Sequence, residues 1–367
     1  MRMTYTGRGS QPDVTARETQ ELSPASAAAR PIGLRDVAKL AGVSVASASM
    51  ALNGQPGVSD ETRRRIATAA EQLGYRANPQ AQALRSGRSS MYGFVVRNLA
   101  NPFFLDVMSA AEQVASEAGA TLLVLDSQYS TDREAEHVKN MAAQRLAGLA
   151  IAPVGAGNSI RLWQQLRPGT PVVALNASLP GQPGLSLVSP DNRAAISLPM
   201  RRIAELGHTS VAFVTAPRGL MADADRLRHF RRQSAVHAVR ASVIYTPLTM
   251  QDVERTTTAA LSDAKRPTSI ITNSDYTAHA IYKAARELSL PIGPAISVVG
   301  HDDLPTSELL DPPLATIRVD RRQMGQALMA RLLAAEPPED FVASVELVER
   351  ASLQAPANGF VDGAYLG

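Results

Sequence analysis

Small and hydroxyl-bearing side chains lie near the start of one predicted helix, and their types and spacing would allow them to form hydrogen bonds and close contacts with a ligand. They are Ser44, Val45, Ala46, Ser47 and Ser49. A helix that presents its first turn to the major groove of duplex DNA can contact base edges with such residues. An ordinary hairpin of two helices fits the same spacing, so the pattern alone leaves both interpretations open.

Three short helices are expected to position these residues. The first spans Leu34–Leu40 and stops at Gly42, which suits the left-handed conformation of a helix end. The second is capped by Ser44 and runs to about Leu52, and the third is capped by Ser59 and ends at Gly74. A small core is expected from Val37, Leu40, Val43, Ala48 and Leu52, together with Ile66, Ala69, Ala70 and Leu73 of the third helix.

Basic residues are concentrated in the same part of the chain. Residues 31–90 contain eight Lys and Arg residues against four Asp and Glu residues, in a chain whose net charge is +3. A nucleic-acid-binding head on a near-neutral body has this charge distribution, although a solvated run of charges would look similar.

The composition excludes several classes of protein. The chain has no cysteine, so disulfide scaffolds, thiolate catalysis and cysteine-based zinc sites are ruled out. The sequence contains no run of about 18 apolar residues, so no membrane span is expected. Residues 1–30 lack the apolar core of a secretory signal. We therefore expect the protein to stay in the cytoplasm.

From Met91 onward, apolar runs of strand length alternate with amphipathic stretches of helical length. The runs are Gly93–Val96, Thr121–Leu125, Gly148–Ala152, Val172–Leu175, Val211–Val214, Ser269–Thr272 and Ser297–Val299. This alternation predicts βαβ units and mostly parallel sheets, and the length of the stretch favours two lobes. Residues 1–30 are expected to be a disordered tail or a misassigned start, and the segment after about Arg350 to be irregular.

Five linked motifs occur in order between residues 36 and 88. They are Asp36-Val37-Ala38-Lys39-Leu40-Ala41-Gly42-Val43-Ser44, Leu52-Asn53-Gly54, Val58-Ser59-x-Glu61-Thr62-Arg63, Leu73-Gly74-Tyr75-Arg76-x-Asn78 and Ala81-x-x-Leu84-Arg85-Ser86-Gly87-Arg88. In this order they resemble the LacI/GalR family of regulators, and further matches extend to about residue 350. The resemblance implies a small all-α helix-turn-helix head plus a hinge helix, joined to a two-lobed α/β sensor domain like that of periplasmic binding proteins.

The same resemblance implies domain boundaries. A helix-turn-helix domain is expected at residues 31–77, a hinge helix and linker at 78–90, and an effector-binding and dimerisation domain at 91–350. The N-lobe of that domain is expected at about 91–188 and 315–338, and the C-lobe at about 189–314 and 339–350. Residues 1–30 and 351–367 would be tails.

The resemblance also assigns DNA contacts. Met50 occupies a recognition-helix position where arginine is common in the family, and methionine cannot make the bidentate contact of arginine to guanine. In the hinge, Leu84 matches an apolar wedge for the minor groove and Ala81 lets paired hinge helices approach; a plain linker is the alternative. Phosphate contacts are expected from Ser44, Ser47, Asn53, Arg63, Tyr75 and Arg76, and Asn78 belongs to the same matched motif.

For the sensor domain, the resemblance implies an effector site between the lobes, at the carboxyl ends of the strands. Phe103 and Phe104 match its apolar wall, Arg226 and Asp302 its polar clamp, and Asp275 another cleft-side position. These groups suit a polyhydroxy ligand such as a sugar. Two simpler interpretations stay open, namely a structural ion pair of Arg226 with Asp302 across the cleft and ordinary core roles for the two phenylalanines.

Together these features predict a sequence-specific DNA-binding transcription regulator, expected to act as a dimeric repressor on a near-palindromic operator and to respond to a small-molecule effector. No cofactor and no metal are expected. An enzyme is the first alternative, but the sequence has no Gly-x-Ser-x-Gly, no Walker-type loop and no metal-spaced pair among its six histidines. A transport binding protein is the second, opposed by the basic head and the missing signal. The protein is expected in the bacterial cytoplasm, at the nucleoid when bound to DNA.

Overall fold

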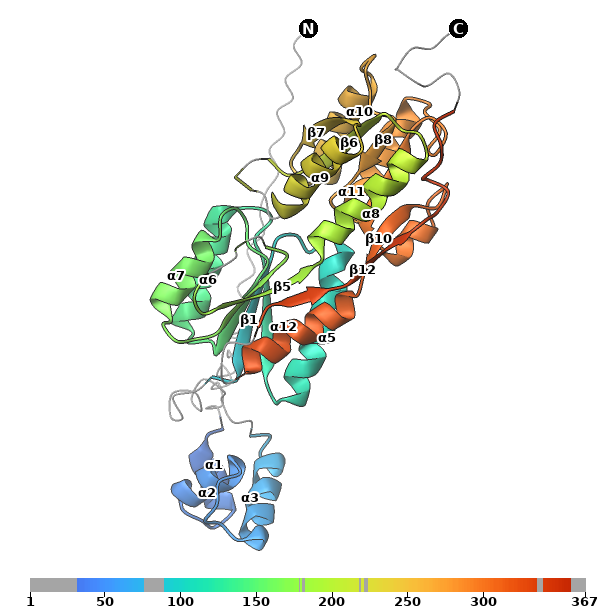
Figure 1. Ribbon diagram of the computed structural model, residues 1–367. Helices are drawn as coiled ribbons and strands as arrows, with labels where there is room; N and C mark the ends of the chain where they lie inside the picture. Colours follow the sequence, from blue (N-terminus) through green and yellow to red (C-terminus); the bar gives the residue numbers. More distant parts are fainter. Residues whose placement is uncertain are drawn as a thin grey trace, which may run out of the picture. The chain divides into compact units, whose positions relative to one another are not determined.

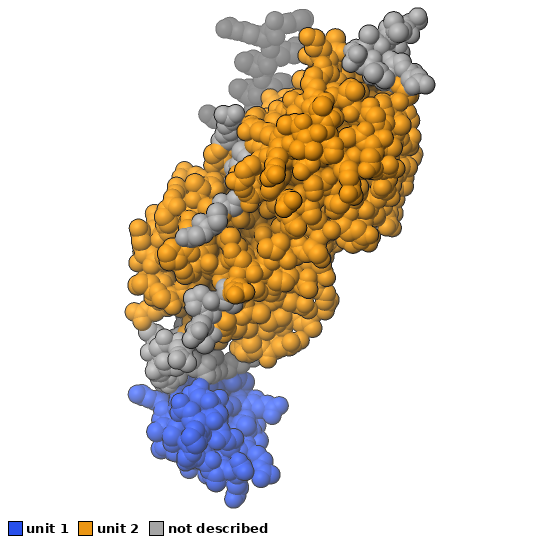
Figure 2. All heavy atoms as spheres, viewed as in Figure 1, with its two compact units in different colours: residues 1–78 blue, residues 79–367 orange. Residues whose placement is uncertain are grey.

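The computed structural model describes residues 32–75, 89–177, 179, 182–217, 219–220, 224–334 and 339–357. The chain forms two compact units, residues 1–78 and residues 79–367 (Figure 2). The tail expected at 1–30 and most of the expected hinge, 78–88, lie outside the described residues. None of the helices in the described parts has the length and apolar character needed to cross a membrane.

The first unit is a head of three helices, α1 (Leu34–Leu40), α2 (Val45–Leu52) and α3 (Asp60–Gln72) (Figure 1). The hydroxyl of Ser44 accepts a hydrogen bond from the backbone N–H of Ser47 at 3.0 Å, and Ser59 caps α3 in the same way. These caps satisfy N–H groups that the start of a helix leaves without partners. Gly42, between α1 and α2, has φ +63°, so the predicted turn and caps are confirmed.

The core of the head is small and built mainly from alanine. Its buried members are Val37, Ala38, Ala41, Ala48, Ala51, Ile66, Ala69 and Ala70, with Val43, Leu52 and Leu73 packed against them. The prediction that Leu40 belongs to this core is wrong, because its side chain is 51% exposed. Residues of a helix are offset by roughly 100° each, which turns Leu40 away from the face formed by Val37, Ala38 and Ala41.

The second unit contains two sheets, and each belongs to one lobe. The first lobe has the order β11-β5-β4-β3-β1-β2, and the second has the order β12-β10-β9-β8-β6-β7. The first-lobe strands are β1 (Met91–Val96), β2 (Thr121–Asp126), β3 (Gly148–Ile151), β4 (Val172–Leu175), β5 (Leu185–Pro190) and β11 (Phe341–Ala343). The second-lobe strands are β6 (Ser210–Thr215), β7 (Arg240–Tyr245), β8 (Ser269–Ile271), β9 (Ser297–Asp302), β10 (Ala315–Val319) and β12 (Val345–Val348). Neighbouring strands are parallel except β12, which is antiparallel to β10.

Helices cover both faces of each sheet. In the first lobe, α5 (Pro102–Glu117) and α12 (Arg321–Leu333) pack on the face that carries Phe94 and Val96. On the opposite face, α6 (Thr131–Ala143) and α7 (Asn158–Leu166) pack against Val95, as the two-residue period of a strand requires. In the second lobe, α10 (Met250–Leu261) and α11 (Asp275–Glu287) cover one face, and α8 (Asn192–Glu205) and α9 (Ala224–Val236) the other (Figure 1). A short 3₁₀ helix, η1 (Pro305–Glu308), follows β9.

The chain passes between the lobes at three places, two of which differ from the prediction. The first passage follows β5 at Pro190, close to the expected position near residue 189. The second comes at about residue 320, because residues 315–319 pair with β9 and belong to the second lobe. The third comes at Ser344, because residues 341–343 pair with β5 in the first lobe. The predicted boundaries at 315 and 339 therefore lie before strands β10 and β11, whereas the chain passes between the lobes only after each of these strands.

The segment after Arg350 is irregular, as expected, but its first residues are not a loose tail. Ser352 and Leu353 are buried against the second lobe. The hydroxyl of Ser352 donates to the carbonyl of Val298 at 2.6 Å and accepts from the N–H of Ala315 at 2.8 Å. Residues 351–357 thus complete the second lobe.

Candidate functional site

A cavity lies between the two lobes, at the carboxyl ends of parallel strands. Arg97 follows β1 directly, Asn176 follows β4, and Asp302 is the last residue of β9. Open α/β sheets bind ligands at this edge. The cavity has a volume of about 40 Å³. Its polar and aromatic lining comprises Arg97, Asn101, Phe103, Phe104, Tyr129 and Asn176 from the first lobe and Arg226, Asn273, Ser274 and Asp302 from the second.

Asp302 presents a buried carboxylate to the cavity. Its Oδ1 lies 3.0 Å from Nδ1 of His301, and its Oδ2 has no hydrogen-bond partner among the described residues. Burial raises the pKa of Asp302 to about 7, while the positive charges of Arg226, Arg321 and Arg97 act in the opposite direction. Near neutral pH the group is therefore partly protonated and can accept or donate a hydrogen bond.

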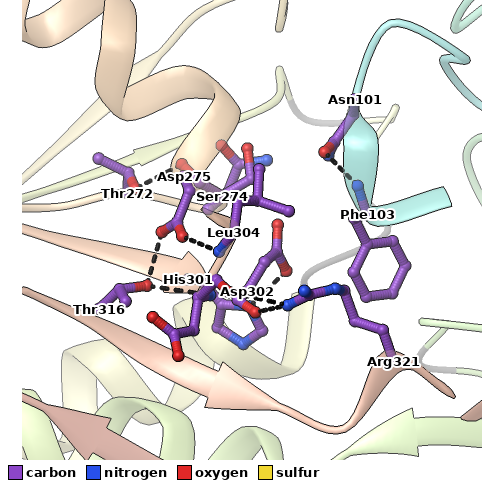
Figure 3. A network of polar contacts seen from close by, with 12 residues as sticks. Asn101, Phe103, Thr272, Ser274, Asp275, His301, Asp302, Leu304, Thr316 and Arg321 are labelled. Carbon is purple, nitrogen blue, oxygen red and sulfur yellow. Dashed lines mark hydrogen bonds and ion pairs between the residues drawn. The ribbon is translucent and has the colours of Figure 1, made fainter. Parts of the chain in front are cut away.

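The backbone turns sharply at Asp302. Its φ is +121° and that of Asp303 is +52°, conformations that cost an L residue energy and that surrounding contacts must maintain. Arg321 supplies such contacts, since its Nη1 donates to the carbonyl oxygens of both residues (Figure 3). Its Nε lies 2.7 Å from Oδ2 of Asp106 on α5. Because α5 belongs to the first lobe and β9 to the second, Arg321 links the lobes beside the cavity.

Arg226, in α9, is held from the same lobe as Asp302. Its Nη1 donates to the carbonyl of Asn273 at 2.9 Å, and its Nε has no hydrogen-bond partner in the part of the chain that the structure describes. The interpretation of Arg226 and Asp302 as an ion pair across the cleft is wrong, because both lie in the second lobe. The charge of Arg226 nevertheless favours the ionised form of Asp302.

Asp275 differs from the other predicted effector residues, because it lies beneath the cavity and does not line it. Its side chain is fully buried at the start of α11. The carboxylate accepts hydrogen bonds from the N–H of Leu304 at 2.8 Å and from the hydroxyl of Thr316 at 2.6 Å (Figure 3). It also accepts one from the hydroxyl of Ser307 at 2.6 Å. Burial, and then the nearby Asp302, raise the pKa of Asp275. With its oxygens occupied, Asp275 positions the loop after Asp302.

Phe103 and Phe104, in the first turn of α5, form part of both the cavity wall and the core of the first lobe. Their rings pack edge to face with centroids 5.2 Å apart, and both are almost fully buried. Asn101 caps α5 by accepting a hydrogen bond from the N–H of Phe103 at 3.0 Å (Figure 3). The two interpretations offered for these phenylalanines are therefore compatible.

Sequence reasoning missed Arg97 and Asn176. Arg97 is buried, its Nη1 donates to the carbonyls of Pro153 and Asn176 at 3.4 Å, and its guanidinium carbon lies 5.9 Å from the ring centroid of Phe104. That distance permits a cation–π interaction. The sequence could have indicated both residues, because each directly follows a predicted buried strand. Residues in that position lie at the edge of the sheet where the carboxyl ends of parallel strands come together.

In the head, the first turn of α2 is available for contacts. Ser44, Val45 and Ala46 are exposed, whereas Ser47, Ser49 and Met50 are half-buried. The Ser44 and Ser47 hydroxyl oxygens lie 2.8 Å apart, so the cap fixes their direction. Three of the predicted readout residues, Ser44, Val45 and Ala46, are therefore on the exposed surface, whereas Ser47 and Ser49 are only partly exposed.

Three residues predicted to contact phosphate also have structural roles in the head. Asn53 donates to the carbonyl of Ser49 at 2.7 Å, and Tyr75 packs against the head core. Arg63 donates to the carbonyls of Ala51 and Gln55, each at 3.0 Å, and so holds the loop that follows α2. The remaining predicted DNA contacts, Arg76, Asn78, Ala81 and Leu84, lie outside the described residues.

Two family models match this chain. Residues 33–78 match the bacterial regulatory proteins of the lacI family, and residues 89–348 match the periplasmic binding proteins and sugar binding domain of the LacI family. The chain belongs to the LacI family. As a LacI-family member it is a DNA-binding transcription regulator, with the predicted helix-turn-helix head and two-lobed α/β body.

Relatives of this LacI-family chain match along nearly their whole length. The transcriptional regulator reg1 of Streptomyces lividans is 31% identical over 334 residues, which cover 87% of this chain and 96% of reg1. The PurR repressor of Aliivibrio fischeri is 25% identical, with 87% and 98% covered. A crystal structure of the Lac repressor dimer bound to operator and the anti-inducer ONPF is 26% identical, with a TM-score of 0.75 and coverage of 88% and 100%. All three are regulators and none is an enzyme, as the sequence predicts for this chain.

In the described parts of this LacI-family chain, no group of three or more His, Asp and Glu side chains is placed to hold a metal ion.

Proposed function

We propose that this LacI-family chain is a dimeric repressor whose affinity for a near-palindromic operator is set by a small molecule bound in the cavity between its lobes. The observation that carries the effector site is a set of buried polar atoms facing one cavity. Arg226 Nε, Asp302 Oδ2 and Asn176 Oδ1 have no hydrogen-bond partners among the described residues. Leaving a buried polar group unpaired costs about 1–3 kcal/mol, and a polar ligand would remove that cost.

The size of the cavity supports a coupling between ligand binding and lobe movement. Its volume of about 40 Å³ is far below the ~300–1,000 Å³ of typical ligand pockets. A polyhydroxy ligand therefore requires the lobes or the lining side chains to move apart. Arg321 contacts both lobes at this place, so such a movement changes its contacts with Asp106 or Asp302. A ligand shifts operator affinity only as far as it prefers one of the two lobe arrangements.

On DNA, the exposed first turn of α2 would supply base contacts from Ser44, Val45 and Ala46. Met50 replaces the guanine contact available to an arginine with apolar contact, for example to a thymine methyl group. Two heads at half-sites about one helical turn apart would give the operator its symmetry. Among the relatives, the Lac repressor is a dimer on its operator, which supports the same arrangement here. This LacI-family chain would act in the bacterial cytoplasm, at the nucleoid.

Selection of the purified full-length protein against a random pool of duplex DNA tests this proposal. The expected outcome is enrichment of a near-palindrome with two similar half-sites. Fluorescence anisotropy with that duplex then reports how candidate effectors change operator affinity. Recovery of a single asymmetric half-site would contradict the dimeric arrangement. An operator affinity that no cavity ligand alters would contradict regulation through the cavity.

A further inference from the structure

We propose that the effector of this LacI-family chain is a hydroxyl-bearing small molecule with an oxyanion group, a carboxylate or a phosphate, held between Arg97 of the first lobe and Arg226 of the second. The inference rests on the proposed function, since it concerns the same cavity. It narrows the ligand class from polyhydroxy molecules in general to acidic ones.

The first support is the charge of the cavity lining. Among the described residues that line it, two are arginines, Arg97 and Arg226, and the only carboxylate is Asp302. A guanidinium group keeps its charge at all physiological pH values. The lining is therefore net positive even with Asp302 ionised, and more so because burial raises the pKa of Asp302 to about 7.

The Glu134 carboxylate partly offsets the positive charge of Arg97, but it does not remove the net positive charge of the cavity lining. It is buried and accepts a hydrogen bond from the N–H of Val154 at 2.7 Å. Burial raises the pKa of Glu134 to about 6, and Arg97 is one of the groups that oppose this rise. Glu134 does not line the cavity, whereas Arg226 does, and the carboxylate on which the charge of Arg226 acts is that of Asp302, which is already counted in the lining.

The second support is the unsatisfied donor on Arg226. The side chain is 92% buried, since its relative exposure is 8%, and its Nε has no partner among the described residues while Nη1 is fixed by Asn273. Arginine recognises carboxylate and phosphate with such fixed, directed N–H groups. A ligand oxyanion gains more from this donor than a neutral hydroxyl does, because charge-assisted hydrogen bonds are about twice as strong.

The N-terminus of α5 adds to the positive potential. Asn101 caps this helix of 16 residues and lines the cavity. The N-terminus of α11 does not add to it, because the Asp275 carboxylate lies in the first turn of that helix. The N-terminus of a helix carries roughly half a positive charge and favours anions. The hydroxyl part of the ligand is supported by the two acceptors without partners, Asp302 Oδ2 and Asn176 Oδ1, which require donors.

Matched ligand pairs test the inference on the full-length protein without DNA. Isothermal titration calorimetry compares glucose with gluconate and with glucose 6-phosphate, and ribose with ribose 5-phosphate. We expect at least one acid to bind at least tenfold more tightly than its neutral parent. Arg97→Gln and Arg226→Gln should each weaken that ligand tenfold or more and remove the preference, while Arg97→Lys should retain part of it. Arg255→Gln is the charge-matched control, because Arg255 is exposed on α10 and does not line the cavity.

If none of these organic ligands binds, protection against thermal unfolding by inorganic phosphate tests the inference instead. At constant ionic strength, phosphate should raise the melting temperature of the wild type and of Arg255→Gln more than that of Arg97→Gln or Arg226→Gln. Equal protection of all four proteins overturns the inference, as does equal or tighter binding of a neutral parent. If a neutral sugar alters operator affinity and its acid does not, the inference fails while the proposed regulation by a cavity ligand stands. A carboxylate or a phosphate is identified by which member of the panel binds.

Discussion

The Asp275 carboxylate and the Thr316 hydroxyl are joined by a hydrogen bond of 2.6 Å, which links α11 to β10 beneath the interlobe cavity. The other oxygen of the same carboxylate accepts from Leu304 and Ser307, which follow Asp302 in the chain. A single buried group thus holds both the loop that directly follows Asp302 and the neighbouring strand β10. Its role is to position Asp302, which explains why a residue matched to the cleft does not reach it.

Replacement of Thr316 with valine should destabilise the body of the protein. The change keeps the shape of the side chain but removes one of three donors to a fully buried carboxylate, at a cost of about 1–3 kcal/mol in the free energy of unfolding. Urea unfolding followed by circular dichroism measures the loss. Thr316→Ser retains the hydroxyl and should lose clearly less. No loss in Thr316→Val together with a loss in Thr316→Ser would show that packing of the methyl group, not the hydrogen bond, matters here.

Arg321→Met should loosen the corner at Asp302. The ion pair with Asp106 is half-exposed and contributes little, so the main loss is the two hydrogen bonds to the carbonyls of Asp302 and Asp303. We expect a decrease of about 1–3 kcal/mol in the free energy of unfolding, together with weaker ligand binding in the cavity. Arg322→Met removes the same charge from an exposed neighbouring position and serves as the control. Indistinguishable behaviour of the two variants in both measurements would exclude a positioning role for Arg321.

Much of the fold could be predicted from local patterns in the sequence. The seven predicted strands correspond to β1, β2, β3, β4, β6, β8 and β9. They were found because most are short continuous apolar runs at the centre of a sheet. Two of the missed strands carry weaker signals: β7 is an edge strand with exposed Arg240 and Ala241, and β12 reads Val-Glu-Leu-Val with little burial. Lobe boundaries near β10 and β11 depend on which strand each one pairs with, and pairing is not visible in local sequence.

The cavity was predictable only in part, because its lining comes from loops far apart in the chain. The family resemblance assigned Phe103, Phe104, Arg226 and Asp302 to an effector site, and all four line the cavity. It did not distinguish a residue that lines a cavity from one that supports it, as Asp275 shows. Gly300 reflects the supporting position of Asp275, because a Cβ at residue 300 would overlap the Asp275 carboxylate.

The raised pKa of Asp302 should make stability depend on pH. In the folded chain the pKa is about 7, against an ordinary value of 3.8. Between these values the folded state holds a proton that the unfolded state has lost, so the free energy of unfolding falls as the pH rises. This contribution is fully present below about pH 4 and is lost as the pH rises through about 7. Asp302→Asn cannot titrate, so its stability relative to wild type should increase by about 2–3 kcal/mol from pH 5 to pH 8.

Melting temperatures of wild type and Asp302→Asn at pH 5, 6, 7 and 8 provide the measurement. Glu134, whose pKa is also raised, contributes a slope to both proteins that cancels in their difference. Parallel profiles would mean that the carboxylate of Asp302 keeps an ordinary pKa and that its burial is relieved by solvent.

Arg63 gives a prediction that separates a structural role in the head from a contact to DNA phosphate. It is half-buried and donates to the carbonyls of Ala51 and Gln55, whereas Arg65, two positions further along α3, is exposed. Arg63→Met should therefore lower the stability of the head by about 1–2 kcal/mol, and Arg65→Met should change it little. Thermal unfolding measures the difference, and the slope of log affinity against log salt concentration reports the phosphate contacts on the selected operator. A slope reduced by about one unit in Arg63→Met without loss of stability would assign Arg63 to phosphate binding alone. Loss of stability with an unchanged slope would assign it to the loop after α2, so that the reading face of that helix depends on Arg63 without its touching DNA.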